Sequence, residues 1–502
     1  MRSVLGFVVL DVFFIGCGAA VLQVIGLGPR ARHATAIAAV LGPAFLIGLT
    51  LVVTVQAVLV VFGAAVTPSG TALTGFGCVA IVWLADRGAS VRRADGRIAR
   101  GPSGRPRVSR TGRRLAMAGT AAGALYLLYV AWSMARLPTV WDDARIWSLR
   151  GLTLYYHHGL QSEIFLNPGQ AGAHPVYPLF QPVLEAVLFG AMGSAQLRFL
   201  HTELWLVCAA AIWTAAYLLA RSTAPSGRVR ALWLAPLTLV AVTPAVIINL
   251  SMGYADITGS VLLAVGTMSL ALWLEEGRPR DLVPAMILLA AAANTKDEDL
   301  VAAVVVLVVS GLATLSFLRP GDVRRVLTER ALPFTGAVAF VAACILPWRI
   351  WVGRHHLRDS VEPSLPHALE PSFIFSRGHE LSQSATAMAS QATGEYGWLA
   401  AIFIVACAIC LTTRTATRAA SVYLFSALLI VAALLWLYTT TSIPLSFLIP
   451  TSMNRTVDVF MVLAAVATAH LVASLTTSLR PRITPSLTAA SSSDRDLRAS
   501  HE

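Results

Sequence analysis

The sequence predicts an all-α polytopic membrane protein with about 13 transmembrane helices. Its 502 residues are 56% hydrophobic and only 13% charged, with a mean hydropathy of +0.69. A soluble chain carries roughly twice this share of charged residues. Apolar runs of about 20 residues, long enough to cross a hydrocarbon core of roughly 30 Å, recur from end to end. A helix bundle therefore accounts for the length, and no separate soluble domain is needed.

Fourteen apolar runs define the expected helices. They cover residues 3–27, 35–61, 70–86, 115–137, 178–193, 199–220, 231–249, 257–274, 282–294, 300–318, 331–352, 397–412, 419–441 and 457–476. The loop from Arg87 to Arg114 holds ten arginines, so the positive-inside rule places it in the cytoplasm and the N-terminus outside. The basic C-terminus is also placed inside, which requires an odd number of crossings. The short run 178–193, which contains Glu185, is the one expected not to cross.

The runs and loops suggest four parts along the chain. These are an N-terminal three-span module (1–86), a basic cytoplasmic loop (87–114), a second transmembrane module (115–476) and a disordered cytoplasmic tail (477–502). The net charge of +12 lies mainly in loops between runs, which indicates topology and not a nucleic-acid partner. All six cysteines fall inside apolar runs, where neither a disulfide nor a redox role is expected. The expected location is the cytoplasmic (inner) membrane, crossed many times, with membrane lipids as partners.

Polar residues from distant loops gather on the predicted outer face, which is a default indication of function at membrane depth. Lys296 is the only lysine in the chain and stands beside Asp297, Glu298 and Asp299. A compact point charge of this kind suits phosphate binding. The alternative is a lysine that only pairs with its acidic neighbours.

The acidic pair Asp142 and Asp143 directly follows a predicted span. A helix over 143–158 would place Asp143, Trp147 and Arg150 on one face, along the membrane surface as an external juxtamembrane helix. Partial desolvation there can make a carboxylate more basic, and such a base could deprotonate an acceptor hydroxyl. The alternative is that one of the two carboxylates caps the start of this helix.

The polar motifs together resemble those of the GT-C superfamily of integral-membrane glycosyltransferases, which includes protein O-mannosyltransferases and aminoarabinose transferases. The closest likeness is to bacterial members with a first loop reading roughly W-D-x4-W-x-L-K/R and then H-x-x-Y-P. The matching residues are Trp141, Asp142, Trp147, Leu149 and Arg150, then His174, Tyr177 and Pro178, then Gly253–Asp256 for G-x-A-D, Thr295–Glu298 for T-K-N/D-E, and Thr451, Ser452 and Arg455 for T-S-x-x-R. The likeness covers residues 115–476, and it departs from the pattern at Val176, where an acidic residue is expected, and at Arg150, where lysine is commoner.

The resemblance implies a GT-C-like catalytic module that transfers a hexose or pentose. The donor would be a polyprenyl-phosphate sugar and the acceptor an envelope glycan, lipid or protein. Asp142 would be the catalytic base, with Asp143 as a second candidate. Lys296, Arg455 and Arg150 would bind the departing phosphate, and Asp256, His174, Tyr177 and Glu298 would complete the substrate site.

Three alternatives remain open on the sequence alone. A divalent cation could be held by Asp142, Asp143, Asp256 and the histidine pairs, although the superfamily varies in its need for metal. A transporter or lipid flippase of envelope precursors would use the same charges without a base. A non-catalytic membrane partner of an envelope assembly complex is the third reading.

Overall fold

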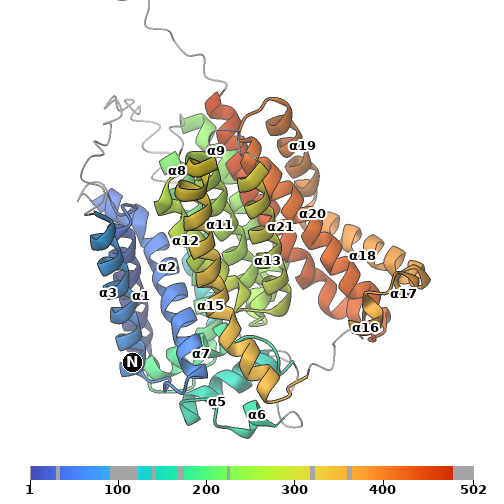
Figure 1. Ribbon diagram of the computed structural model, residues 1–502. Helices are drawn as coiled ribbons and strands as arrows, with labels where there is room; N and C mark the ends of the chain where they lie inside the picture. Colours follow the sequence, from blue (N-terminus) through green and yellow to red (C-terminus); the bar gives the residue numbers. More distant parts are fainter. Residues whose placement is uncertain are drawn as a thin grey trace, which may run out of the picture.

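The protein is a bundle of α-helices, seen here in a computed structural model that describes residues 2–29, 34–90, 122–123, 125–137, 143–167, 174–222, 227–316, 323–358 and 365–478. These residues contain helices and no strands (Figure 1). The helices are α1 (Arg2–Val24), α2 (Ala34–Val61), α3 (Pro68–Ser90), η1 (Asp143–Ser148), α5 (Leu149–His157), α6 (Glu163–Leu166), α7 (Phe180–Met192), α8 (Arg198–Ser222), α9 (Gly227–Val242), α10 (Pro244–Ser251), α11 (Ala255–Glu276), α12 (Pro279–Ala293), α13 (Asp297–Ser316), α14 (Val323–Val326), η2 (Leu327–Ala331), α15 (Leu332–Arg354), α16 (Leu365–Ala368), α17 (Pro371–Ser376), α18 (Gly378–Tyr396), α19 (Leu399–Thr412), α20 (Thr417–Thr440) and α21 (Leu445–Ser478).

The apolar helices fit a polytopic membrane protein. Nine helices of the described residues are long and apolar enough to cross a bilayer, and the number rises to 11 if each of two bent pairs counts as one span. The bent pairs are α9 with α10, at 47°, and α18 with α19, at 92°. The expected count of about 13 stays a prediction, because part of the run 115–137 lies outside the described residues.

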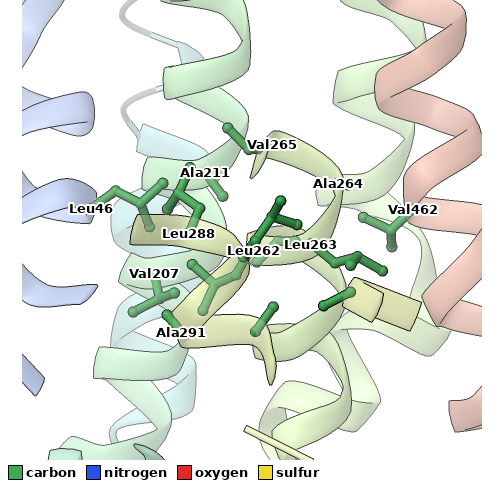
Figure 2. Packing of buried hydrophobic residues seen from close by; sticks show 14 of the residues in the cluster. Leu46, Val207, Ala211, Leu262, Leu263, Ala264, Val265, Leu288, Ala291 and Val462 are labelled. Carbon is green, nitrogen blue, oxygen red and sulfur yellow. The ribbon is translucent and has the colours of Figure 1, made fainter. Parts of the chain in front are cut away.

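Helix α11 forms the centre of the bundle. Its most apolar 18-residue window is entirely buried, as expected of a helix that is hydrophobic on all sides. Figure 2 shows Leu262 and Leu263 of α11 among Leu288 of α12, Val207 of α8 and Val462 of α21. With 22 residues, α11 is about 33 Å long and sets the distance between the two ends of the bundle.

Helices α1 and α2 pack on each other through small residues. A Cβ atom on Gly18 would lie 1.8 Å from the carbonyl oxygen of Ala44, and one on Gly48 would lie 1.9 Å from that of Phe14. Such close backbone approach is typical of helix pairs in membranes. Leu46 of α2 also belongs to the same buried cluster as α8, α11 and α12 (Figure 2). The basic loop and the tail lie almost entirely outside the described residues, so the four-part division of the chain stays a prediction.

The two ends of the bundle carry different groups. At the end we call the basic end, Arg330 and Arg418 donate to the carbonyl oxygen of Leu274 near the C-terminus of α11, at 2.8 and 3.1 Å. The opposite end, called the site end, holds Asp256 at the start of α11 and Lys296 just before α13. The positive-inside rule indicates that the basic end faces the cytoplasm.

Helix α7, from the run 178–193, keeps both of its ends at the site end. The backbone N–H of Phe180 donates to the carbonyl of Asn294 at 2.9 Å, and the hydroxyl of Ser194 lies 3.0 Å from that of Ser3 at the start of α1 (Figure 1). The helix has 13 residues, and its length of about 20 Å is less than the roughly 30 Å of the hydrocarbon core. This geometry fits the expectation that the run does not cross.

The sidedness can be tested with two engineered cysteines at opposite ends. We expect Ser372→Cys, on exposed α17 at the site end, to react with a membrane-impermeant maleimide in intact cells, and Thr413→Cys, exposed at the basic end, to react only after permeabilisation. The six native cysteines are buried and give little background. The reverse pattern of labelling would show that the site end faces the cytoplasm.

Candidate functional site

A cavity of about 710 Å³ lies at the site end, where the starts of α11, α13 and α21 meet. Five of the predicted site residues line it, and they come from segments up to about 280 residues apart: His174, Tyr177, Lys296, Glu298 and Arg455. Asp256 contacts Lys296 directly behind the cavity wall. The structure therefore brings together residues from four of the sequence motifs. We call this space the polar cavity.

Lys296 is the centre of a buried charge cluster. Its Nζ lies 2.8 Å from Oδ1 of Asp256 and 3.2 Å from Oε1 of Glu298, and the residue is 7% exposed. The same Nζ lies 5.8 Å from the ring centre of Tyr177. An ammonium group with two carboxylate partners stays charged at this depth, because the partners compensate for the lost hydration.

Two short turns hold this cluster in place. Asn294 and Thr295 end α12 by donating from their side chains to the carbonyls of Ala290 and Ala291, both at 2.8 Å, so that Lys296 stands in the turn before α13. On the other side, Gly253 has a φ of +70°, which suits glycine, and closes the turn between α10 and α11. Gln181 of α7 donates to the Gly253 carbonyl at 2.9 Å and so fixes the turn that precedes Asp256.

The lining of the polar cavity is cationic. Arg145, Lys296 and Arg455 line it together with a single carboxylate, that of Glu298. The guanidinium of Arg455 lies 4.2 Å from the ring centre of Tyr254, a cation–π distance that positions its charge at the wall. The lining itself thus carries three cationic groups and one carboxylate. The cavity therefore attracts an anion.

An aromatic stack supports one side of the cavity. The rings of Trp147, Tyr177 and His174 lie face to face, with centroid distances of 5.4 Å between Trp147 and Tyr177 and 4.5 Å between Tyr177 and His174. Trp348 of α15 donates from its indole nitrogen to the carbonyl of Val176 at 2.9 Å. The predicted residues His174 and Tyr177 are thus presented from a rigid, buried base.

Arg150 lies behind the stacked rings and does not line the polar cavity. It is 1% exposed, and its Nη2 donates to the carbonyl of Tyr177 at 2.8 Å. Burial lowers the pKa of Arg150 to about 9, although Asp297 and Glu185 act in the opposite direction. The resemblance gave Arg150 a phosphate-binding role, but the observed position is that of a group that orients Tyr177.

A second cavity of about 330 Å³, here called the apolar cavity, adjoins the polar one. The two share His174, Tyr177, Glu298 and Leu437. The remaining lining comes mainly from apolar residues of α13, α15 and α20: Val301, Ala302, Val352, Ile430, Ala433, Leu434 and Trp436. A cationic space and an apolar space thus meet at a common wall.

The acidic pair of the first loop is only partly described. Asp142 lies outside the described residues, and for Asp143 the structure gives the backbone at the start of η1. A helix does run over 143–157, as predicted, but its first six residues are π-helical. Trp147 and Arg150 share its buried face, and Arg145, two residues after Asp143, lines the polar cavity.

Several lining residues were not predicted. Asn249, Tyr254, Tyr438 and Thr456 contribute to the polar cavity. Tyr254 occupies the variable position of the G-x-A-D motif, and its aromatic character was the one signal that could have identified it. Asn249 and Tyr438 carry no local signal, because their position depends on how α10 and α20 pack against α21.

The described residues contain no group of three or more histidine, cysteine or acidic side chains arranged to hold a metal ion. His157, His158 and His356, from the two histidine pairs of the sequence, are exposed. The question of a divalent cation stays open, since Asp142 lies outside the described part of the chain. Comparison with protein-family models, with curated proteins and with solved structures gives no match for this chain.

Proposed function

We propose that this protein is a GT-C-type glycosyltransferase that moves a hexose or pentose from a polyprenyl-phosphate donor to an acceptor at the outer face of the cytoplasmic membrane. The observation that supports this most is the junction of the cationic polar cavity with the apolar cavity. A lipid-linked phosphate is an anion with a long apolar chain, and it suits both spaces at once. The ordered likeness of five sequence motifs to that superfamily supports the same proposal.

In the proposed reaction an acceptor hydroxyl oxygen attacks the anomeric carbon of the donor sugar. The hydroxyl proton passes to a carboxylate of the first loop, for which Asp142 is the first candidate. The bond between the anomeric carbon and the phosphate oxygen breaks, and its electron pair leaves with the polyprenyl phosphate. Lys296 and Arg455 stabilise the charge that develops on this oxygen, while Asp256 and Glu298 keep Lys296 in position.

The prenyl chain is proposed to lie along the apolar cavity. Val301 is 47% exposed on the outside of α13, so the chain can pass from there into the hydrocarbon of the bilayer. His174 and Tyr177, which belong to both cavities, would then mark the place of the phosphate. The acceptor would be an envelope glycan, lipid or protein that approaches from the outer aqueous side.

The proposal predicts that purified protein in vesicles of phosphatidylethanolamine and phosphatidylglycerol moves label from a radiolabelled polyprenyl-phosphate sugar to an envelope fraction. Thin-layer and gel separation would show the label leaving the lipid phase and an equal amount of polyprenyl phosphate appearing. We expect transfer at a rate at least tenfold above vesicles without protein. Because envelope fractions differ in acceptor, glycan, lipid and protein fractions are to be assayed separately, and label that stays on the lipid in all three would contradict the proposal.

A transporter or flippase of envelope precursors is the second candidate, and the break between α9 and α10 favours it. The two helices meet at 47° and α10 contributes Ile248 and Asn249 to the polar cavity. Broken helices at a ligand site are typical of transporters. In the same vesicles, a fluorescent polyprenyl phosphate that becomes accessible to an external quencher, with no sugar transferred, would favour this function over the first.

A further inference from the structure

One amide in the polar cavity is fixed in a single orientation. Asn249 of α10 lines the cavity, is 1% exposed, and donates from Nδ2 to Oδ2 of Asp458 at 2.7 Å. The other oxygen of Asp458 accepts from the hydroxyl of Tyr396. Asp458 is fully buried and lies one turn after Arg455 on α21.

The contact with Asp458 determines which end of the amide is free. Nδ2, the donor end of the amide, faces Oδ2 of Asp458, whose other oxygen already accepts from Tyr396, so Oδ1 is the end that this carboxyl group does not use. The carbonyl Oδ1 accepts no hydrogen bond from the described residues. Asn249 therefore offers the cavity an acceptor.

Neighbouring hydroxyls in the cavity are occupied within the protein. Tyr438 contacts the hydroxyls of Ser452 and Thr456 at 2.8 and 3.0 Å. These two hydroxyls donate in turn to the carbonyls of Leu448 and Ser452, at 2.9 and 3.0 Å. The hydroxyls of Ser452 and Thr456 thus use their hydrogens within the protein, whereas Oδ1 of Asn249 receives no hydrogen bond from the described residues.

The surrounding charge limits what that ligand group can be. A cationic donor is disfavoured, because Arg145, Lys296 and Arg455 line the same space with a single carboxylate. A neutral hydroxyl is the donor that fits a carbonyl acceptor next to a phosphate site.

We propose that Asn249 is a specificity-determining residue that accepts a hydrogen bond from a hydroxyl of the sugar ring, and that Asp458 is the positioning residue that holds its amide. This assignment rests on the proposed function, since it places the sugar of the donor between the phosphate site and α10. It predicts that the site selects neutral hydroxylated rings over rings without hydroxyls and over amino sugars.

The test uses three phosphodiester probes on the ten-carbon prenol citronellol, carrying a glycosyl, a cyclohexyl or an aminoglycosyl group. The glycosyl and cyclohexyl probes share charge and ring size and differ in hydroxyls. Dissociation constants are measured by titration calorimetry with full-length protein in lipid nanodiscs, for glucosyl, mannosyl and arabinosyl probes. We expect the best glycosyl probe to bind at least tenfold tighter than the cyclohexyl probe.

Asn249→Leu is expected to reduce this preference about tenfold while cyclohexyl binding stays within about twofold. Asp458→Asn, which can still pair with both of its partners, releases the amide to rotate and is expected to reduce the preference about threefold. Tyr396→Phe is the matched control, because it removes the other bond to Asp458 and leaves the Asn249 contact; its preference should equal that of the wild type. If Asn249→Leu misfolds and no longer binds the cyclohexyl probe, the preference measured for Asp458→Asn decides whether the Asn249 amide contacts the sugar.

The outcomes separate this assignment from the proposed function. Two results would overturn the role of Asn249: equal binding of the glycosyl and cyclohexyl probes, or a preference for the glycosyl probe that is unchanged in Asn249→Leu. If binding of these probes still depends on Lys296, the phosphate site is upheld all the same. Tighter binding of the aminoglycosyl probe than of the glycosyl probe would also overturn the role of Asn249. Binding of none of the probes would reject the proposed function and this assignment together.

Discussion

Replacing Lys296 by methionine is expected to lower sugar transfer by a factor of about 10²–10³. This is the usual loss when one group that stabilises developing negative charge is removed. Methionine fills a similar volume but has no charge to offer the phosphate. Transfer is measured with the labelled donor in reconstituted vesicles, and donor binding by competition with inorganic phosphate.

The same substitution is expected to destabilise the fold, which has to be separated from the effect on transfer. Asp256, only 3% exposed, would lose its ammonium partner at 2.8 Å. Removing one member of a buried ion pair costs about 3–5 kcal/mol. The double variant Lys296→Met with Asp256→Asn removes the more deeply buried of the two carboxylates that lose their partner and leaves Glu298, whose side chain is 17% exposed, so we expect most of the thermal stability to return.

The double variant is therefore the informative one. If Lys296 binds the donor phosphate, the double variant folds but remains inactive. If Lys296 only balances its acidic neighbours, transfer returns together with the stability. The second result would restrict Lys296 to the structural role that the sequence left open.

Distant motifs could be predicted to meet, because each lies at the end of an apolar run. Counting crossings forwards from the arginine-rich loop put residues 138–178 outside. Counting back from the basic C-terminus put residues 256, 296 and 443–456 on the same side, on condition that one run does not cross. In the structure Tyr177, Asp256, Lys296 and Arg455 do lie together at the site end. The lengths of the apolar runs and the positions of the basic loops were sufficient for this result. Each spanning helix starts on one side of the bilayer and ends on the other, so the side of every loop follows by counting.

The contacts within the site could not be predicted in the same way. Asn249 and Asp458 are 209 positions apart, and their hydrogen bond depends on the rotation of α10 and α21 about their axes. Hydropathy does not encode that rotation when, as in α11 with a buried window throughout, all faces are apolar. The resemblance placed Arg150 at the phosphate, and in the structure it lies behind Tyr177, where its guanidinium donates to the Tyr177 carbonyl. The sequence motif identified Arg150 as a candidate, and the packing of its helix determines which group Arg150 contacts.

The orientation of η1 bears on which carboxylate acts as the base. Arg145 lines the polar cavity and follows Asp143 by two positions, so the first loop reaches the cavity at this point. The acidic pair precedes the helix that packs Trp147 and Arg150 into the core. The proposed base is therefore tested at Asp142 and Asp143 themselves.

Replacing Asp142 by asparagine is expected to reduce transfer by at least about 10³-fold, within the range that a general base contributes. Asparagine keeps the shape of the side chain and removes its ability to take a proton, so binding of the glycosyl probe should remain within about twofold of the wild type. The matched control is Asp143→Asn, for which we expect a loss of about tenfold or less. Both variants are compared by initial rates with the labelled donor at saturating acceptor.

The comparison of the two variants assigns the base. Full transfer by Asp142→Asn with a large loss in Asp143→Asn would move the base to Asp143, and the proposed chemistry would survive with one residue changed. Full transfer by both variants, and by the variant that carries both substitutions, would mean that neither Asp142 nor Asp143 accepts the proton. In that case, retained Lys296-dependent movement of lipid across the vesicle membrane would favour a flippase, because lipid translocation requires the cationic cavity and no base.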